Sequence, residues 1–293
     1  MKKIAFLASP RYKFILEKCP DFIDEFEVLK TEFARFGVKL IIADWQDQSI
    51  DWKSFDKVIP KACWDYSNFP KQFLSYLRHC DAAKVEFQNP IETLLWNMRK
   101  TYLSDLYSRG FNVGELKIIP ENSKLCISEI QSELNPDKML VIKPSVSGGA
   151  KNTIRCPAKE LGTHEALLKL ILSEADLIIQ PYFSEIATEG EYSFFFFGNE
   201  FSHAILKKPA QGDFRAHQLF GGENLNYEPS LTEIKEAFKF TEGAPTPLAY
   251  ARVDVFRSKG RFMLIELELI EPYLYFERAP KESLARFCEA VLR

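Results

Sequence analysis

Near its end the chain reads Phe262-Met263-Leu264-Ile265-Glu266-Leu267-Glu268-Leu269-Ile270-Glu271-Pro272. Side chains alternate between the two faces of a β-strand, so Glu266 and Glu268 share a face with Leu264 and Ile270. Because both faces of this strand are largely apolar, we expect the two carboxylates to be sheltered from water. Two adjacent anions away from water are costly unless a cation or protons compensate them.

The stretch 251–256 is expected to be the partner strand, and it contains one carboxylate, Asp254. A connecting loop of three or five residues centred on Gly260 would place Asp254 opposite Glu266. Three oxygen ligands would then meet at one place, an arrangement that suits Mg²⁺. The alternative is an edge strand whose acidic residues are solvated.

Upstream, a lysine precedes a loop of small residues. Lys143 ends the predicted strand 139–143, and Ser147-Gly148-Gly149-Ala150 follows it. Backbone N–H groups of small residues can approach phosphate oxygens, and a nearby lysine adds positive charge. The GxxxxGK[ST] order of a Walker A loop is missing. On its own, the loop favours phosphate binding no more than a plain turn.

Other polar residues indicate a binding site only when they are considered together. Lys100 on a predicted helix 91–108, Lys207-Lys208 and Arg215 could add cations to one anionic site, although each alone suits an ordinary surface. Gln180-Pro181-Tyr182-Phe183 ends an apolar strand, and Pro181 cannot donate a ladder hydrogen bond. Backbone groups of Gln180 and Tyr182 left free there could bind the edge of an adenine.

Composition limits the classes of function. Charged residues are 27% of the 293, and the net charge of −3 gives no basic field for nucleic acid. No apolar run approaches the roughly 20 residues of a membrane span. The six cysteines form no CxxC pair, so we expect reduced thiols and a cytoplasmic protein. We therefore expect neither a nucleic-acid nor a membrane partner.

Three blocks separate by pattern. Residues 1–90 alternate short apolar runs with amphipathic ones, which predicts a small parallel α/β domain. Residues 91–183 contain the predicted helix 91–108 and the candidate phosphate loop. Residues 184–293 are rich in hairpins, with a two-residue turn at Gly198-Asn199 and the carboxylate hairpin.

The order of these motifs resembles the ATP-grasp superfamily, in its glutathione-synthetase-like branch. The anchors, in chain order, are Trp96-Asn97-Met98-Arg99-Lys100, Ile142-Lys143-Pro144, Ser147-Gly148-Gly149-Ala150, Gln180-Pro181-Tyr182, Glu189-Gly190-Glu191-Tyr192-Ser193, Lys207-Lys208-Pro209-Ala210, Gly212-Asp213-Phe214-Arg215, Gly221-Gly222, Arg252-Val253-Asp254 and Glu266 to Pro272. The resemblance implies a mixed α/β (α+β) ATP-grasp fold. An N-terminal Rossmann-like pre-ATP-grasp lobe would cover 1–90. Two α+β lobes, 91–183 and 184–293, would hold ATP between antiparallel sheets.

The resemblance also implies roles and cofactors, namely ATP with one or two Mg²⁺ ions, or Mn²⁺ in their place. Lys100, Lys143 and the loop Ser147–Ala150 would hold phosphates, Gln180–Phe183 the adenine, Glu191 the ribose, and Asp254, Glu266 and Glu268 the metal. Arg215 would stabilise charge on the reacting carbonyl. The family motif favours Lys207 as the third phosphate lysine. The turn at Gly198-Asn199 instead puts Lys208 on the Glu191 face unless a bulge intervenes, so both stay candidates.

The N-terminal block is similar to that of the cycloserine-forming cyclo-ligases, through Lys61-Ala62-Cys63-Trp64-Asp65-Tyr66. Those relatives tend to carry Arg at the position of Lys61. Arg grips carboxylates bidentately and Lys does not, so the substrate is not carried over. Lys61 and Asp65 are candidate substrate contacts, and Trp64 is expected to pack in the core.

Together, these patterns predict an ATP-dependent carboxylate–amine, or carboxylate–thiol, ligase. It would form an acyl phosphate on a small amino-acid-like or peptide-like substrate and convert ATP to ADP and phosphate. Its partners would be small-molecule carboxylates and amines, and a homodimer stays open. Two alternatives remain, a small-molecule kinase on the same scaffold and a nucleotide-binding protein without chemistry.

Overall fold

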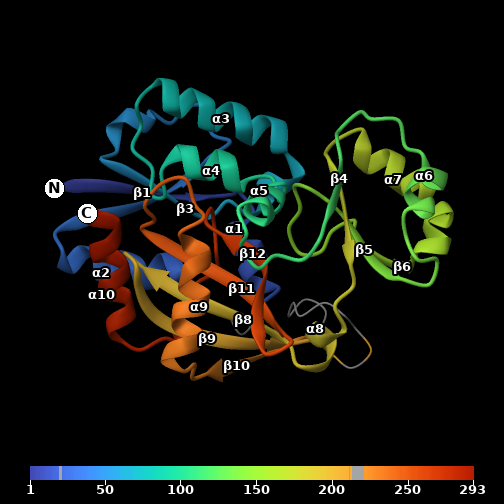
Figure 1. The fold of residues 1–293 in the computed structure, drawn as a ribbon. Helices are drawn as coiled ribbons and strands as arrows, with labels where there is room; N and C mark the ends of the chain where they lie inside the picture. The colour runs from blue at the N-terminus through green and yellow to red at the C-terminus, as the bar shows by residue number, and fades with distance from the viewer. Residues whose placement is uncertain (20–21, 211, 213–220) are drawn as a thin grey trace.

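The structure is a computed structural model that describes residues 1–19, 22–210, 212 and 221–293, arranged around three β-sheets (Figure 1). Arg215 lies outside the described residues. Two of the sheets are antiparallel and one is parallel.

The N-terminal lobe, as we call the parallel sheet with its helices, has the strand order β2-β1-β3. Its strands are β1 (Lys2–Ala8), β2 (Val38–Asp44) and β3 (Lys57–Ala62), and its helices are α1 (Tyr12–Glu17), α2 (Glu25–Arg35) and α3 (Pro70–Ala82). Ile4 and Phe6 of β1 belong to the same buried cluster as the apolar residues of α2. Ala5 and Leu7 belong to a second cluster that contains those of α3. The alternation along β1 thus buries both of its faces.

A four-stranded antiparallel sheet, in the order β4-β7-β5-β6, stands apart in the green and yellow region of Figure 1. Its strands are β4 (Lys117–Ile119), β5 (Met139–Pro144), β6 (Ile154–Pro157) and β7 (Leu177–Pro181), and its helices are α6 (Ile127–Ser132) and α7 (Glu165–Leu172). These elements enclose a core of their own.

The helix predicted over 91–108 is wrong in one respect, because the chain forms two helices there. These are α4 (Ile91–Asn97) and α5 (Tyr102–Ser108). In the break between them, the backbone N–H of Lys100 donates to the carbonyl of Ser145 at 2.7 Å. The break therefore ties Lys100 to the end of β5, the strand that carries Lys143.

A five-stranded antiparallel sheet in the order β10-β9-β8-β11-β12 forms the largest layer. Its strands are β8 (Glu191–Phe197), β9 (Glu200–Lys208), β10 (Glu223–Tyr227), β11 (Tyr250–Ser258) and β12 (Arg261–Glu268), and its helices are α8 (Ser184–Thr188), α9 (Leu231–Thr241) and α10 (Glu282–Leu292). Phe194 and Phe196 share a core with α9, whereas Phe195 and Phe197 share one with α10 and α2. This Phe-rich strand, β8, is therefore buried on both faces.

The carboxylate hairpin pairs as predicted, but by a different route. Its turn has two residues, Lys259 and Gly260, both with positive φ (51° and 77°), instead of three or five. That turn alone would slip the register by one residue. A bulge between Asp254 and Val255 corrects the slip, and Asp254 lies opposite Glu266.

A second bulge decides between the two candidate lysines. The turn at Gly198-Asn199 has two residues, as predicted, with Phe197 opposite Glu200. The register then shifts between Phe195 and Phe196, so that Glu191 lies opposite Lys207. The adjacent Lys208 is exposed.

Candidate functional site

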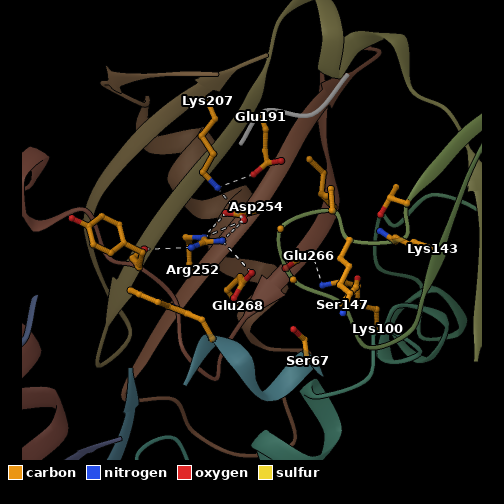
Figure 2. Close-up of a pocket in the computed structure, with 18 of the residues that line it drawn as sticks. Ser67, Lys100, Lys143, Ser147, Glu191, Lys207, Arg252, Asp254, Glu266 and Glu268 are labelled. Atoms are coloured by element: carbon orange, nitrogen blue, oxygen red, sulfur yellow. Dashed lines mark hydrogen bonds and ion pairs between the residues drawn. The ribbon is translucent and has the colours of Figure 1, made fainter. Parts of the chain in front are cut away.

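A cavity of about 480 Å³ lies between the two antiparallel sheets and is closed on one side by the N-terminal lobe (Figure 2). Its walls come from β5 and β7 on one side and from β8, β9, β11 and β12 on the other. The structure brings together there fifteen of the residues singled out from the sequence: Lys100, Lys143, Ser147, Gly148, Gly149, Ala150, Gln180, Pro181, Tyr182, Phe183, Glu191, Lys207, Asp254, Glu266 and Glu268.

The three carboxylates of the hairpin face cations (Figure 2). Glu266 pairs with Lys100 at 2.8 Å, and Asp254 accepts from Lys207 at 3.3 Å. Arg252 bridges the other two acids, at 3.0 Å from Asp254 and 3.2 Å from Glu268. Over residues 1–19, 22–210, 212 and 221–293, no three His, Cys, Asp or Glu side chains are arranged to hold a metal ion. The hairpin acids are neutralised by protein cations instead.

Burial and neighbouring charge set the protonation of these acids. Burial would raise the pKa of Glu266, but Lys100 holds it well below its usual range. The pKa of Asp254 is likewise lowered against burial by Arg252 and Lys207. Burial raises the pKa of Glu268, and Arg252 only partly opposes this while the Glu266 anion adds to it. Asp254 and Glu266 are therefore anions, and their oxygens and those of Glu268 are of the ligand type that Mg²⁺ prefers. In this structure the three side chains contact Lys100, Lys207 and Arg252 instead of meeting at one point.

At the other wall, Lys143 forms no ion pair within the part of the chain that the structure describes. Burial, with repulsion from Lys100, lowers the pKa of Lys143 to about 8. Its strand leads into the loop Ser147–Ala150, where Gly149 and Ala150 both have left-handed backbone (φ 57° and 56°). The loop is tied to the N-terminal lobe by Lys151, whose ammonium donates to Asn68 at 2.6 Å.

Lys207 is held by two acids. Its ammonium donates to Glu191 at 2.8 Å and to Asp254 at 3.3 Å. Burial and Arg252 would lower the pKa of Lys207, but these two carboxylates together raise it, so the side chain stays charged. Gly190 allows the strands to approach, since a Cβ there would lie 2.6 Å from the carbonyl oxygen of Lys207.

The predicted adenine edge needs one correction. Pro181 lies in β7 and pairs with Leu140. The backbone N–H of Tyr182 was expected to be free, but it donates to the carbonyl of Met139 at 2.9 Å. Any adenine contact by a backbone group here must therefore come from other atoms of Gln180–Phe183.

Two candidate substrate contacts lie away from the cavity lining. Lys61 is fully buried and pairs with Glu25 at 3.0 Å. Asp65 accepts from Trp45 at 3.0 Å and from Gln46 at 2.7 Å. A buried charge needs a partner at hand, and both side chains have partners in the N-terminal lobe, while Lys61 also donates to the Pro272 carbonyl beyond β12.

Several lining residues carry no role in the sequence analysis. Arg252 belongs to a quoted motif, and its position two residues before Asp254 on a strand was the signal that both share a face. Trp64 packs against a buried core cluster, as expected, and it also lines the cavity and donates to the Glu271 carbonyl at 3.1 Å. Glu271 belongs to a quoted motif but had no assigned role, and Tyr273 and Tyr275 lie outside every quoted motif; all three line the cavity.

The bulge in β9 makes a direct prediction. For the ATP site that the resemblance implies, Lys207→Ala should lower kcat/KM for ATP about 100-fold, because it removes a buried cation from the cavity. Lys208→Ala should change it less than about twofold, as exposed charges contribute little. Steady-state ADP release measures both. A larger loss in Lys208→Ala than in Lys207→Ala would contradict the register.

In the described residues, no helix has the length and apolar character needed to cross a membrane.

Comparison with known proteins gives consistent matches. Residues 4–89 match the family described as D-cycloserine synthetase DcsG, N-terminal domain. The chain is 24% identical over 268 residues to the cycloserine biosynthesis protein DcsG of Streptomyces lavendulae, covering 87% of this chain and 88% of that protein.

Solved structures show the same fold. The crystal structure of D-cycloserine synthetase DcsG superposes with a TM-score of 0.82 at 22% identity, over 99% of this chain and 98% of that one. D-alanine–D-alanine ligase from Bacillus anthracis, complexed with ATP, superposes with a TM-score of 0.66 at 12% identity, over 100% and 96%. The predicted fold is confirmed: the chain has the same fold as D-cycloserine synthetase DcsG and D-alanine–D-alanine ligase, and its sequence is similar to that of a cycloserine biosynthesis protein.

Proposed function

We propose that this protein is an ATP-dependent ligase that activates a small carboxylate as an acyl phosphate and transfers the acyl group to an amine or a thiol. One observation carries the proposal. A single cavity between two antiparallel sheets holds Lys100, Lys143 and Lys207 together with the carboxylates of the hairpin. Such a set of opposite charges suits a triphosphate with its divalent cation.

Each part of the cavity has a proposed task. Lys100, Lys143 and the loop Ser147–Ala150 bind the phosphates, and Lys207 adds charge beside Glu191, which faces the ribose. Asp254, Glu266 and Glu268 would hold Mg²⁺, which when bound neutralises charge on the phosphoryl oxygens. Gln180–Phe183 border the base. Arg215 is proposed to stabilise the oxyanion of the reacting carbonyl.

The reaction has two steps. A carboxylate oxygen attacks the γ-phosphorus in line, the bond to the β-phosphate bridging oxygen breaks, and ADP leaves. The amine or thiol then attacks the acyl carbon, phosphate leaves with the electron pair of the broken C–O bond, and the proton lost by the nucleophile passes to the phosphate or to solvent. Exclusion of water from the cavity during the reaction would protect the acyl phosphate from hydrolysis.

A trapping experiment tests this proposal. The protein is incubated with ATP, Mg²⁺ and a panel of amino acids and dipeptides, with and without hydroxylamine. A ligase should release ADP and phosphate in equal amounts, and hydroxylamine should convert the acyl phosphate to a hydroxamate. ADP release with a stable phosphorylated product and no free phosphate would indicate the kinase alternative. Absence of ADP release across the panel, with nucleotide bound, would favour a binding protein.

A further inference from the structure

The N-terminal lobe contains a buried ion pair that the proposed chemistry does not use. The ammonium of Lys61 lies 3.0 Å from a carboxylate oxygen of Glu25, and their side chains are 0% and 3% exposed. Glu25 opens α2 and Lys61 lies in β3. Lys61, predicted as a substrate contact, does not line the cavity, and Glu25 has no predicted role.

Both partners also bind the backbone of one segment beyond β12. Lys61 donates to the carbonyl of Pro272, and Glu25 accepts from the N–H of Leu274 at 2.6 Å. The pair thus joins the N-terminal lobe to a segment more than 200 positions away in the chain. Two further bonds act on the same segment, from Trp64 to the Glu271 carbonyl and from the Ile23 N–H to the Tyr273 hydroxyl.

The side chains of this segment line the cavity. Glu271, Tyr273 and Tyr275 alternate with Pro272 and Leu274, whose backbone groups are held. The ring of Tyr273 stacks on Phe22 of the N-terminal lobe, with centroids 3.8 Å apart and planes 7° apart. Tyr275 has left-handed backbone (φ 50°), a conformation that persists only where its surroundings fix it.

Folding stability is a weak reason for such a pair. Burial raises the pKa of Glu25 and lowers that of Lys61, and the partner's charge only partly opposes each shift. Replacing a buried ion pair by apolar residues of similar volume is often neutral or stabilising. The pair instead fixes the position of the segment, because its two charged groups each form a hydrogen bond with one backbone atom of that segment.

We propose that Glu25 and Lys61 are positioning residues, which hold the 271–275 segment so that Tyr273 and Tyr275 shape the end of the cavity that receives the small-molecule substrate. The inference rests on the proposed ligase function. The nucleotide end, built from β5, β7 and the loop 147–150, does not depend on the pair. Loss of the ion pair should therefore weaken substrate binding and leave nucleotide binding unchanged.

The test is the double variant Glu25→Leu/Lys61→Met, which removes both charges and leaves no buried charge unpaired. The control is Lys57→Met/Glu86→Gln, which removes the 2.9 Å ion pair between Lys57 of β3 and the exposed Glu86. Thermal unfolding, calorimetric binding of ADP and steady-state kinetics with the substrate found in the panel are measured for both. Lys61→Arg tests rescue by a conserved charge.

We expect the double variant to fold, to bind ADP within about twofold of the original protein, and to raise KM for the substrate about tenfold or more. The control and Lys61→Arg should stay close to the original KM. An unchanged KM would overturn the proposal, and so would an equal loss of ADP and substrate binding, which indicates a general structural role.

A different result would contradict the proposed ligase function itself, namely that the original protein releases no ADP with any substrate of the panel. In that case hydrogen exchange decides the positioning role. The double variant should then exchange the amide of Leu274 and its neighbours faster, with β11 and β12 unchanged. Unchanged exchange at Leu274 would overturn the positioning role.

Discussion

Replacing Glu266 by glutamine is expected to lower ATP turnover about a thousandfold, the scale seen when a preorganised charge is removed from an active site. Glu266 pairs with Lys100 at 2.8 Å and lies opposite Asp254 across the hairpin. Lys100 holds the pKa of this carboxyl far below its usual range despite burial, so it is an anion at any pH used for assay. Glutamine keeps the shape but removes the charge that would bind Mg²⁺.

The measurement is ADP release together with nucleotide affinity at several Mg²⁺ concentrations. The original protein should bind ADP more tightly as Mg²⁺ rises, and Glu266→Gln should lose most of that dependence. Glu200→Gln is the matched control, because Glu200 is an exposed carboxylate in β9 of the same sheet. A Glu266→Gln protein that keeps both its turnover and its Mg²⁺ dependence would exclude this hairpin as the metal site.

The hairpin could be found from sequence because strand alternation and burial act locally. Two acids in an apolar run share a face whatever the rest of the chain does. The pairing register of the two hairpins was harder to predict from the sequence. A β-bulge adds one residue to a strand, and no sequence signal is strong enough to locate it. Bulges in both hairpins set the pairings Asp254–Glu266 and Glu191–Lys207.

Other elements show which features local sequence patterns can predict and which depend on tertiary contacts. The start of α9 follows a local pattern, the capping box in which Ser230 and Glu233 bond each other's backbone. The break between α4 and α5 follows a tertiary contact from Lys100 to Ser145, which no local pattern shows. Domain boundaries at 90 and 183, and the Rossmann-like character of the first block, stay predictions.

The role of Lys61 likewise could not be predicted from local sequence alone. Its sequence neighbours suggested a substrate contact, but its partners are Glu25 and Pro272, 36 and 211 positions away. A lysine in an apolar strand can reach either a ligand or a distant acid. Only the packing of the N-terminal lobe against the 271–275 segment decides between them.

The second large effect concerns pH. Because burial and Lys100 lower the pKa of Lys143 to about 8, this lysine is charged at pH 7 and mostly neutral at pH 9 in the free protein. Nucleotide affinity should therefore be constant below pH 8 and fall above it, towards about tenfold per pH unit. The bound phosphates favour the charged form, so binding at pH 9 should take up close to one proton. Calorimetry in buffers of different ionisation enthalpy measures both quantities.

Replacing Lys143 by arginine separates the contribution of Lys143 to the pH dependence from that of other groups that titrate between pH 7 and 9. A guanidinium stays protonated to pH 12 and beyond, so Lys143→Arg should bind nucleotide with a flat profile between pH 7 and 9, whatever its absolute affinity. Glu271 also titrates here, since burial raises its pKa to about 8, but it becomes an anion as pH rises. Glu271→Gln should therefore leave the fall caused by Lys143 in place. If the fall persists in Lys143→Arg and disappears in Glu271→Gln, repulsion by the Glu271 anion sets the pH dependence, and the task assigned to Lys143 is wrong.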